Sequence, residues 1–261
     1  MDKEQHISQD KINEIWRKQW SSKSFRGVSV ANIFQQRLFV EGYPIFKKHL
    51  PDNPGDVLDA GGGTGRYGLK IAQNFPESNV VISDILEESL GIGQQLASEM
   101  HLKNVFFEQD DLLSSKFPDN KFDVVVSDVV IQHLPDYTTA LKEIKRITKP
   151  GGRILISTNN FWNFHTPFKT VLKIVGQYEY GYEKSFSRKE LVRTMAKEGL
   201  NIIAVDGFYV GYGIFRLKKY NRIFHFLGRA VNRLSKILDK LTGRFFSRNF
   251  GFEILVVAQK P

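Results

Sequence analysis

A glycine-rich turn between an apolar segment and a helical segment constrains the fold of this chain more than any other feature of its sequence. Residues 57–60 read Val-Leu-Asp-Ala, and residues 61–68 read Gly-Gly-Gly-Thr-Gly-Arg-Tyr-Gly. Gly61, Gly63 and Gly65 remove side chains from the turn, so its backbone can adopt dihedral angles that other residues tolerate poorly and can approach a ligand closely. The sequence therefore predicts a strand, a loop that cradles a ligand, and a helix in succession.

Residues 63–68 also match the dinucleotide-binding pattern G-x-G-x-x-G, in which a pyrophosphate lies at a helix N-terminus. Asp59 argues against that ligand, because a carboxylate two residues before the first glycine would repel a pyrophosphate. The same carboxylate would attract a ligand that carries an ammonium and a sulfonium group. S-adenosylmethionine has both charges and no phosphate, so we expect it in preference to a nicotinamide cofactor.

Two further acidic positions follow the next two apolar segments. Asp84 closes the segment 79–83 and lies 19 residues after Gly65, a spacing that suits binding to the two hydroxyls of a ribose. Asp110 and Asp111 close the segment 105–109, where a carboxylate and the adjacent backbone can meet an adenine amino group. Three acidic strand ends in succession predict one nucleoside site.

Together these motifs resemble the class I S-adenosylmethionine-dependent methyltransferases, over roughly residues 45–210 and the last expected strand. Two later segments fit the same family. The strand expected at 122–127 is followed by Asp-Val-Val-Ile-Gln-His-Leu, and the turn Lys-Pro-Gly-Gly at 149–152 precedes a strand at 153–157. The overall pattern is similar to the branch that methylates quinone precursors and other small molecules.

The resemblance implies a cofactor site made of Asp59, Gly61, Gly63, Gly65, Asp84, Ile85, Asp110, Asp111, Leu112, Ser127 and Asp128. Asp59, Gly61 and Gly63 would hold the methionine end and Asp84 the ribose. Asp110 would meet the adenine, with Asp111 and Leu112 beside it. Ser127 and Asp128 would face the reactive sulfonium.

Apolar and helical segments alternate along the chain, as in a doubly wound, mostly parallel α/β sheet, and the resemblance implies seven strands. The last two are expected at 201–205 and 252–258. Ser187 is expected to cap a helix at 188–197, with Glu190 completing a capping box. We expect an N-terminal helical lid at 1–50, a cofactor-binding core at 51–210 and 251–261, and a helical insertion at 211–250.

The aromatic residues of the N-terminal segment have two interpretations. At helical spacing they fit core packing, which we favour, and in this family such an extension often covers the cofactor. They are Trp16, Trp20, Phe25, Phe34 and Phe39.

Composition narrows the chemistry. The chain has no cysteine, which excludes disulfides, a cysteine-held iron–sulfur cluster and methylation through a thiolate nucleophile. Its first residues are polar, and no segment reaches the ~18–20 apolar residues of a spanning helix. We expect a cytoplasmic enzyme, peripheral on the inner face of a membrane if the insertion binds lipid.

The insertion before the last strand carries the charge of the molecule. Residues 214–250 contain ten basic residues and one acid, Asp239, and this excess equals the formal net charge of the whole chain, +9. On a helix, one side is basic: Lys218, Arg222, Arg229, Arg233, Lys236, Lys240 and Arg244. The other is apolar: Tyr220, Ile223, Phe224, Leu227, Val231, Leu234, Leu238, Leu241 and Phe245. Gly228 and Gly243 are expected to interrupt the helix.

Such an amphipathic segment fits an anionic membrane surface, through residues 214–248, and this is the interpretation we favour. A helical cap packed on its own domain with a solvated basic face is the main alternative. Binding to nucleic-acid phosphates is a weaker one, because residues 127–130 read Ser-Asp-Val-Val and lack the [D/N/S]-P-P-[Y/F] motif of base-amino methyltransferases.

The expected reaction moves a methyl group to an O, N or C atom of a small-molecule or lipid-like acceptor: a quinone precursor, a lipid or a lipid-linked glycan. The alternatives are an RNA methyltransferase that holds phosphates with the insertion, and a non-catalytic cofactor-binding partner subunit. The oligomeric state is not predicted.

His133 is the candidate general base, because an imidazole titrates near neutrality. It could equally hold the loop before Pro135, and His165 is a weaker candidate. No resident metal is expected, because Asp128, Asn159 and Asn160 offer one carboxylate where a magnesium site of the catechol type uses two.

Overall fold

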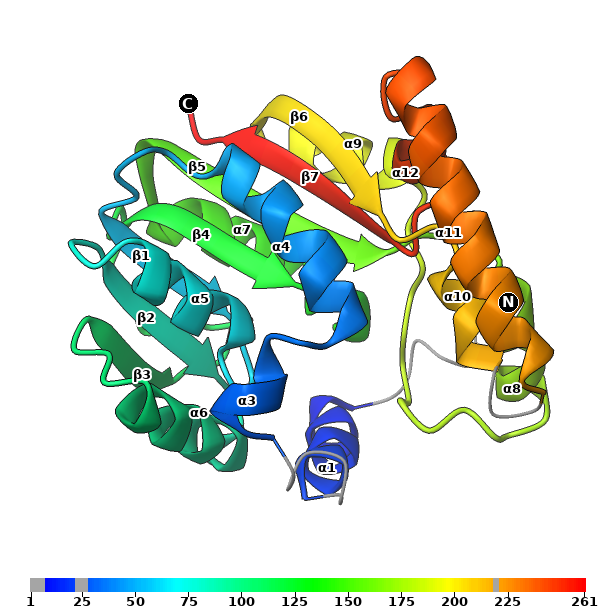
Figure 1. Ribbon diagram of the computed structural model, residues 1–261. Coiled ribbons are helices and arrows are strands. Elements are labelled where there is room, and N and C mark those ends of the chain that lie inside the picture. The colour runs from blue at the N-terminus through cyan, green and yellow to red at the C-terminus, as the bar shows by residue number, and fades with distance from the viewer. Residues whose placement is uncertain (1–7, 22–27, 218–220) are drawn as a thin grey trace.

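A seven-stranded sheet forms the centre of the computed structural model, which describes residues 8–21, 28–217 and 221–261 (Figure 1). The strands are β1 (Asp56–Ala60), β2 (Asn79–Asp84), β3 (Val105–Gln109), β4 (Phe122–Asp128), β5 (Thr148–Asn159), β6 (Asn201–Phe208) and β7 (Glu253–Gln259). Their order is β3-β2-β1-β4-β5-β7-β6, and β7 runs antiparallel to both neighbours. The prediction of a doubly wound, mostly parallel sheet is confirmed.

Helices cover both faces of this sheet. On one face lie α4 (Arg37–His49), α5 (Arg66–Asn74) and α6 (Glu87–Glu99), and on the other α7 (Tyr137–Ile147) and α9 (Arg188–Lys197). Successive residues of a strand point to opposite faces, so Val57 belongs to the first hydrophobic cluster and Leu58 to the second. Among the described residues before β6, the other helical segments are α1 (Gln9–Trp20), α3 (Val30–Ile33), η2 (Ile131–His133) and α8 (His165–Ile174).

The start of α9 agrees with the expected cap. The Ser187 hydroxyl accepts a hydrogen bond from the Glu190 amide at 3.2 Å. The Glu190 carboxylate lies 2.9 Å from Lys184 Nζ. The Ser187 half of the expected capping box is therefore present, whereas the Glu190 side chain forms an ion pair with Lys184 instead.

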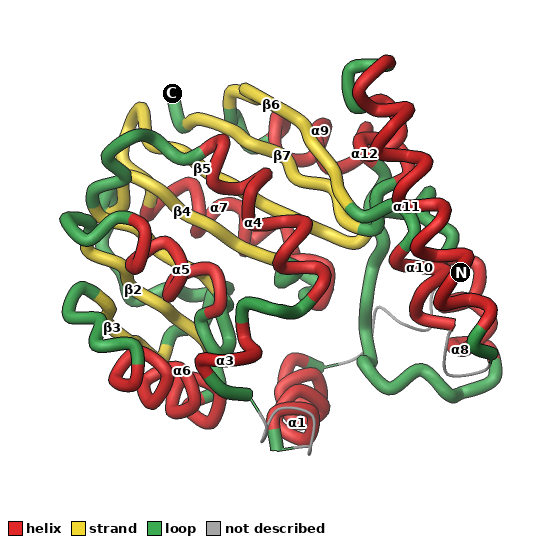
Figure 2. The backbone as a smooth tube through the Cα atoms, in the orientation of Figure 1, coloured by secondary structure: helices red, strands yellow, loops and turns green. Residues whose placement is uncertain are grey.

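The insertion forms α10 (Tyr212–Arg216), α11 (Ile223–Leu241) and α12 (Phe245–Phe250), a helical group beside β6 and β7 (Figure 2). Gly243 has φ +59° and separates α11 from α12, as expected. Gly228 does not interrupt α11, and that expectation is wrong. A Cβ at Gly228 would lie 2.8 Å from the Gly211 carbonyl oxygen and 2.7 Å from the Phe215 amide nitrogen, so the glycine allows close packing between α10 and α11.

Around its axis α11 has three faces rather than the two opposed faces that the sequence predicted. The face against the domain consists of small or polar residues: Gly228, Asn232, Ser235 and Asp239. The opposite side is exposed and apolar, and we call it the α11 apolar stripe: Ile223, Phe226, Leu227, Leu234, Ile237 and Leu241, each 45–80% exposed. Basic residues occupy the flank between these two faces.

Some sequence predictions concern residues outside the described parts of the chain. They are Phe25, Lys218, Lys219, Tyr220 and residues 1–7 of the expected lid. Among the described helices, none combines the length and the apolar character needed to cross a membrane.

Candidate functional site

A pocket lies where the carboxyl ends of β1, β2, β3 and β4 meet, beside the place where the strand order reverses. The sheet brings the predicted site residues together there, although they are spread over 75 positions of the chain from Asp59 to His133. All of them except Gly65 and Ser127 line this pocket. Trp16 and Trp20 of the N-terminal segment also line the pocket, as the cofactor-covering interpretation of that segment implied. Residues that the sequence did not predict come from α10, from the segment before α9, which contributes Glu183, and from the start of β7.

Asp59 is buried at the floor of the pocket. Its Oδ2 accepts a hydrogen bond from the Gly68 amide at 2.8 Å, whereas its Oδ1 has no hydrogen-bond partner among the described residues. Burial raises the Asp59 pKa to about 7, and the nearby carboxylate of Asp128 adds to the effect. A buried carboxylate oxygen without a donor fits a positively charged group of a ligand.

The glycine loop is shaped by its surroundings. Gly63 has φ +59°, and a Cβ there would lie 2.5 Å from the Trp20 ring of α1. Gly65 has φ +76° as the N-cap of α5, and a Cβ there would lie 2.4 Å from Ile82. Gly65 therefore lets α5 pack against the sheet behind the pocket. Gly61 and Gly63 line the pocket itself.

Asp84 connects the end of β2 to the glycine loop. Its carboxylate accepts hydrogen bonds from the Gly63 amide and the Leu86 amide, each at 2.9 Å. Burial raises the Asp84 pKa, and these amides counteract the rise by stabilising the charge. Each oxygen can accept one further donor, and with Ile85 beside it the carboxylate faces the pocket.

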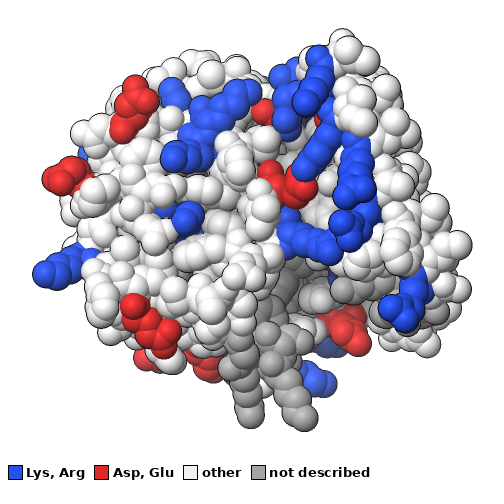
Figure 3. Space-filling model, viewed as in Figure 1, with Lys and Arg blue, Asp and Glu red and all other residues white. Residues whose placement is uncertain are grey.

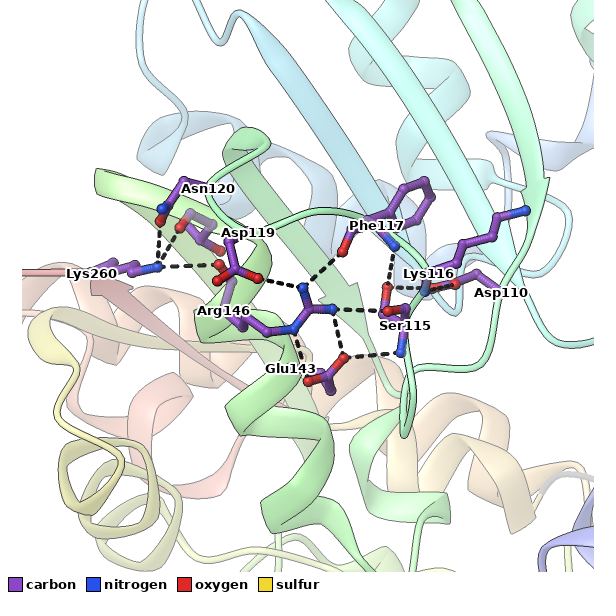
Figure 4. A network of polar contacts seen from close by, with 10 residues as sticks. Asp110, Ser115, Lys116, Phe117, Asp119, Asn120, Glu143, Arg146 and Lys260 are labelled. Atoms are coloured by element: carbon purple, nitrogen blue, oxygen red, sulfur yellow. Dashed lines mark hydrogen bonds and ion pairs between the residues drawn. The ribbon is translucent and has the colours of Figure 1, made fainter.

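A polar network fixes the loop after β3, which carries Asp110, Asp111 and Leu112 (Figure 4). The Asp110 carboxylate accepts the Ser115 hydroxyl at 2.8 Å and the Lys116 amide at 2.9 Å. From α7, Arg146 holds the same loop by donating to the carbonyls of Ser115 and Phe117 and to the carboxylate of Asp119. Glu143 of the same helix accepts from Arg146 and from the Ser115 backbone amide. Asp110 thus stabilises the loop that places Asp111 and Leu112 on the pocket wall, and it lines the pocket itself.

At the end of β4 the two predicted neighbours of the sulfonium differ in position. Ser127 is fully buried away from the pocket. Asp128 lines the pocket and accepts the Ser157 hydroxyl at 2.6 Å, and Arg66 lies 3.7 Å from it. Glu253 of β7 is hydrogen-bonded to Asp128, and burial raises the pKa of both carboxyls. Burial and the proximity of the two groups therefore favour the protonated form at this carboxyl pair.

Glu253 is a pocket residue that sequence reasoning missed. Its sequence context is the start of an apolar strand, and only the antiparallel pairing of β5 with β7 places it opposite Asn159 and close to Asp128. In the described parts of the chain, no three His, Asp or Glu side chains are arranged to hold a metal ion.

His133 lies at the edge of the pocket within η2. Its Nδ1 is 3.0 Å from the Tyr182 carbonyl oxygen, and its ring meets Trp16 of α1 edge to face at a centroid distance of 4.7 Å. Burial lowers the His133 pKa, and Glu183 opposes the change. His165, the weaker candidate, does not line the pocket and lies in α8 beside Phe252.

Several aromatic side chains line another part of the pocket wall. Trp16 of α1, Tyr180, Tyr212 of α10 and Phe252 line it, together with the Arg216 guanidinium, which lies 5.8 Å from the Tyr180 ring centre. The insertion thus contributes to the pocket through α10. This wall suits a ligand with a ring or another apolar body.

Comparisons with known proteins agree with this geometry. The family model described as "Methyltransferase domain" matches residues 52–199. Demethylmenaquinone methyltransferase of Deinococcus radiodurans is 33% identical over 107 residues, 41% of this chain and 44% of that protein. The enzyme of the same name from Listeria monocytogenes is 29% identical over 151 residues, 55% of this chain and 62% of that protein. These matches span about half of the relatives' length.

A solved structure extends the similarity to the fold as a whole. Phosphoethanolamine N-methyltransferase 2 of Haemonchus contortus, in complex with S-adenosyl-L-methionine, has a TM-score of 0.66 at 20% identity and covers 98% of this chain and 60% of its own. The residues that the family model matches include the glycine loop and the acidic strand ends, and they make up more than half of the sequence. The chain therefore belongs to the methyltransferase domain family, the S-adenosylmethionine-dependent methyltransferases of the class I fold.

Proposed function

We propose that this protein methylates an O, N or C atom of a small, lipid-like acceptor at the surface of an anionic membrane. The acceptor class is a quinone precursor, another lipid or a lipid-linked glycan. The printed names of the curated relatives, demethylmenaquinone methyltransferases, support the quinone class. The aromatic wall beside His133 supports an acceptor with a ring.

The proposed cofactor contacts follow from the donor and acceptor sets. The free oxygen of Asp59 suits the ammonium group of the cofactor, and the Asp84 carboxylate suits its ribose hydroxyls. Asp111 and Leu112 form the wall for the adenine, and Asp128 lies nearest to the reacting end. When bound, S-adenosylmethionine supplies a methyl group on an electrophilic sulfonium. The contribution of the protein is mainly to align the acceptor atom with that group and to exclude water.

The α11 apolar stripe is the observation that carries the membrane proposal. Its side chains recur at residues 223, 227, 234, 237 and 241, a spacing that places them along one side of the helix. Small polar residues occupy the face against the domain, so the apolar side chains are left without a partner in the described structure. Exposed apolar side chains in such a row mark an interaction surface.

Charge favours a membrane over a second copy of the chain. Arg222, Arg229, Arg233 and Lys240 flank the stripe and form no ion pair with described residues. Figure 3 shows Lys and Arg side chains in a row along α11 beside an uncharged outer edge. Two such helices face to face would bring like charges together, whereas anionic headgroups attract each basic residue by about 1 kcal/mol.

Other basic residues of the insertion anchor it to the domain instead. Lys236 pairs with Glu41 at 2.6 Å, and Arg244 pairs with the buried Asp206 at 2.6 Å. These contacts account for part of the predicted basic face. They also hold α11 in a defined orientation while its flank and stripe face outward.

Titration calorimetry with S-adenosylmethionine and its demethylated product, with and without liposomes of anionic phospholipid, tests the proposal. We expect micromolar binding of both compounds and co-sedimentation of the protein with anionic but not with neutral liposomes. Absence of cofactor binding would contradict the methyltransferase assignment of this site. Cofactor binding without liposome binding would contradict the membrane part of the proposal and favour a water-soluble acceptor. Binding to RNA in place of liposomes would favour the RNA-methyltransferase alternative.

A further inference from the structure

A buried cluster of charged and polar side chains adjoins His133. Glu183, in the segment between α8 and α9, is its centre, and the side chains of Glu183 and Lys169 are only 5% and 6% exposed. Lys169 Nζ donates to Glu183 Oε1 at 2.8 Å, and the side-chain amide of Asn159 donates to the same oxygen at 3.0 Å. The Tyr178 hydroxyl donates to Oε2.

These contacts keep Glu183 ionised inside the protein. Burial alone would raise its pKa, but His133, Lys169 and Tyr178 outweigh burial and hold the pKa at about 2. A buried ion pair contributes little net stability compared with apolar residues of similar volume. A permanently charged carboxylate beside a pocket therefore needs an explanation other than stability.

Hydrogen bonds define which nitrogen of His133 carries the proton. The Tyr182 carbonyl can only accept, so His133 Nδ1 at 3.0 Å carries the hydrogen in the neutral ring. The side-chain oxygen Oε1 of Gln132 accepts from the backbone amide of Asn159 at 2.6 Å. This turns the side-chain nitrogen Nε2 of Gln132 toward His133 Nε2, at 3.2 Å. Nε2 therefore carries the lone pair, and the Glu183 carboxylate lies 3.9 Å from it.

We propose that Glu183 is a positioning residue that prepares His133 to take a proton at Nε2 from the acceptor, and this proposal rests on the proposed methyl transfer. An acceptor hydroxyl or amine would replace the Gln132 amide at Nε2. As the acceptor atom forms its bond to the methyl carbon and the methyl–sulfur bond breaks, the O–H or N–H proton moves to Nε2. The resulting imidazolium is stabilised by the Glu183 carboxylate, and the proton returns to solvent after product release.

The charged groups that act on His133 are few. Glu183 favours the imidazolium, and Lys169 and Lys173 of α8 oppose it. An opposite charge within ~4–6 Å raises the pKa of a histidine by ~1–3 units. Removing the Glu183 charge should therefore lower the pKa of His133 and weaken it as a base.

The histidine signals of the ¹⁵N-labelled full chain, followed by long-range ¹H–¹⁵N NMR against pH, test this without knowledge of the acceptor. The His133 signal is assigned by its loss in His133→Gln. In the wild type we expect the Nδ1–H tautomer. Glu183→Gln should lower the His133 midpoint by about one unit. Glu183→Asp keeps the charge at a greater distance from His133. Its His133 midpoint should therefore lie between those of the wild type and Glu183→Gln.

Glu190→Gln is the matched control, because Glu190 in the first turn of α9 pairs with Lys184 at the surface and does not line the pocket around His133. It should leave the His133 midpoint unchanged. An unchanged midpoint in Glu183→Asp and Glu183→Gln, or an Nε2–H tautomer in the wild type, would overturn the proposal. Cofactor titration of the same samples separates this outcome from failure of the proposed function, which would appear as loss of S-adenosylmethionine binding in the wild type.

Discussion

At the scale of single residues, Asp59 combines the requirements of folding and of binding. Its folded-state pKa of about 7 lies above its usual value, so this residue stabilises the cofactor-free fold least when the pH exceeds 7 and the carboxylate is charged. A cationic ligand needs that same charged form. Cofactor affinity should therefore fall as the pH drops below about 7, which calorimetry at a series of pH values measures.

Asp59→Asn separates these two effects. The amide oxygen can still accept from the Gly68 amide, but the buried charge is gone. We expect a higher melting temperature than the wild type at pH 8 without ligand, no difference near pH 4, and a loss of cofactor binding of ~1–3 kcal/mol at pH 8. Wild-type affinity in this variant would remove Asp59 from the cofactor site.

The residues that could be predicted are those whose role is local in sequence. Asp59 precedes a glycine loop and Asp84 ends an apolar strand, so each is visible within a few positions. Glu183 and Glu253 follow no such pattern. They reach the pocket through the return of the loop after α8 and through the pairing of β5 with β7, and both depend on tertiary contacts.

At the scale of elements, each strand of the described sheet was predicted close to its observed position, from apolar runs together with the family resemblance. The central strands are continuously apolar because both of their faces are buried, whereas the edge strands β3 and β6 are partly exposed. The faces of α11 were harder to assign. Helical spacing separates apolar from basic residues, but it does not say which side meets the domain, and here that side is the small polar one. The reason is Gly228, whose packing against Gly211 brings the backbones of α10 and α11 together.

Two helical glycines with different surroundings test this account. Gly228→Ala would place a methyl group 2.7 Å from the Phe215 amide, so we expect a loss of ~1–3 kcal/mol in unfolding free energy. Gly91→Ala in α6 meets no atom within 4 Å and should gain ~0.5–1 kcal/mol from helix propensity. Denaturant unfolding measures both, and equal effects of the two changes would contradict close packing at Gly228.

At the scale of the whole molecule, the insertion contributes both to the pocket and to the outer surface. Its α10 lines the pocket with Tyr212 and Arg216, while its α11 presents the apolar stripe to the outside. If α11 binds a membrane, the short helix α10 lies between that membrane surface and the pocket. Docking would then restrict how the pocket meets an acceptor that resides in the lipid.

The α11 apolar stripe can be removed without touching the pocket. Leu234→Ser, Ile237→Ser and Leu241→Ser together change three side chains that are 57–80% exposed, so the fold and the cofactor affinity should persist. Each apolar side chain that is lost from the acyl boundary should weaken membrane binding by ~1–2 kcal/mol. Partition into anionic liposomes should therefore fall at least tenfold. The matched control changes three exposed apolar residues on other elements, Val40, Phe106 and Ile203, to serine and should bind liposomes as the wild type does. Equal binding by both triple variants would show that α11 is not the docking surface, and a stripe variant that changes from dimer to monomer would assign the stripe to self-association.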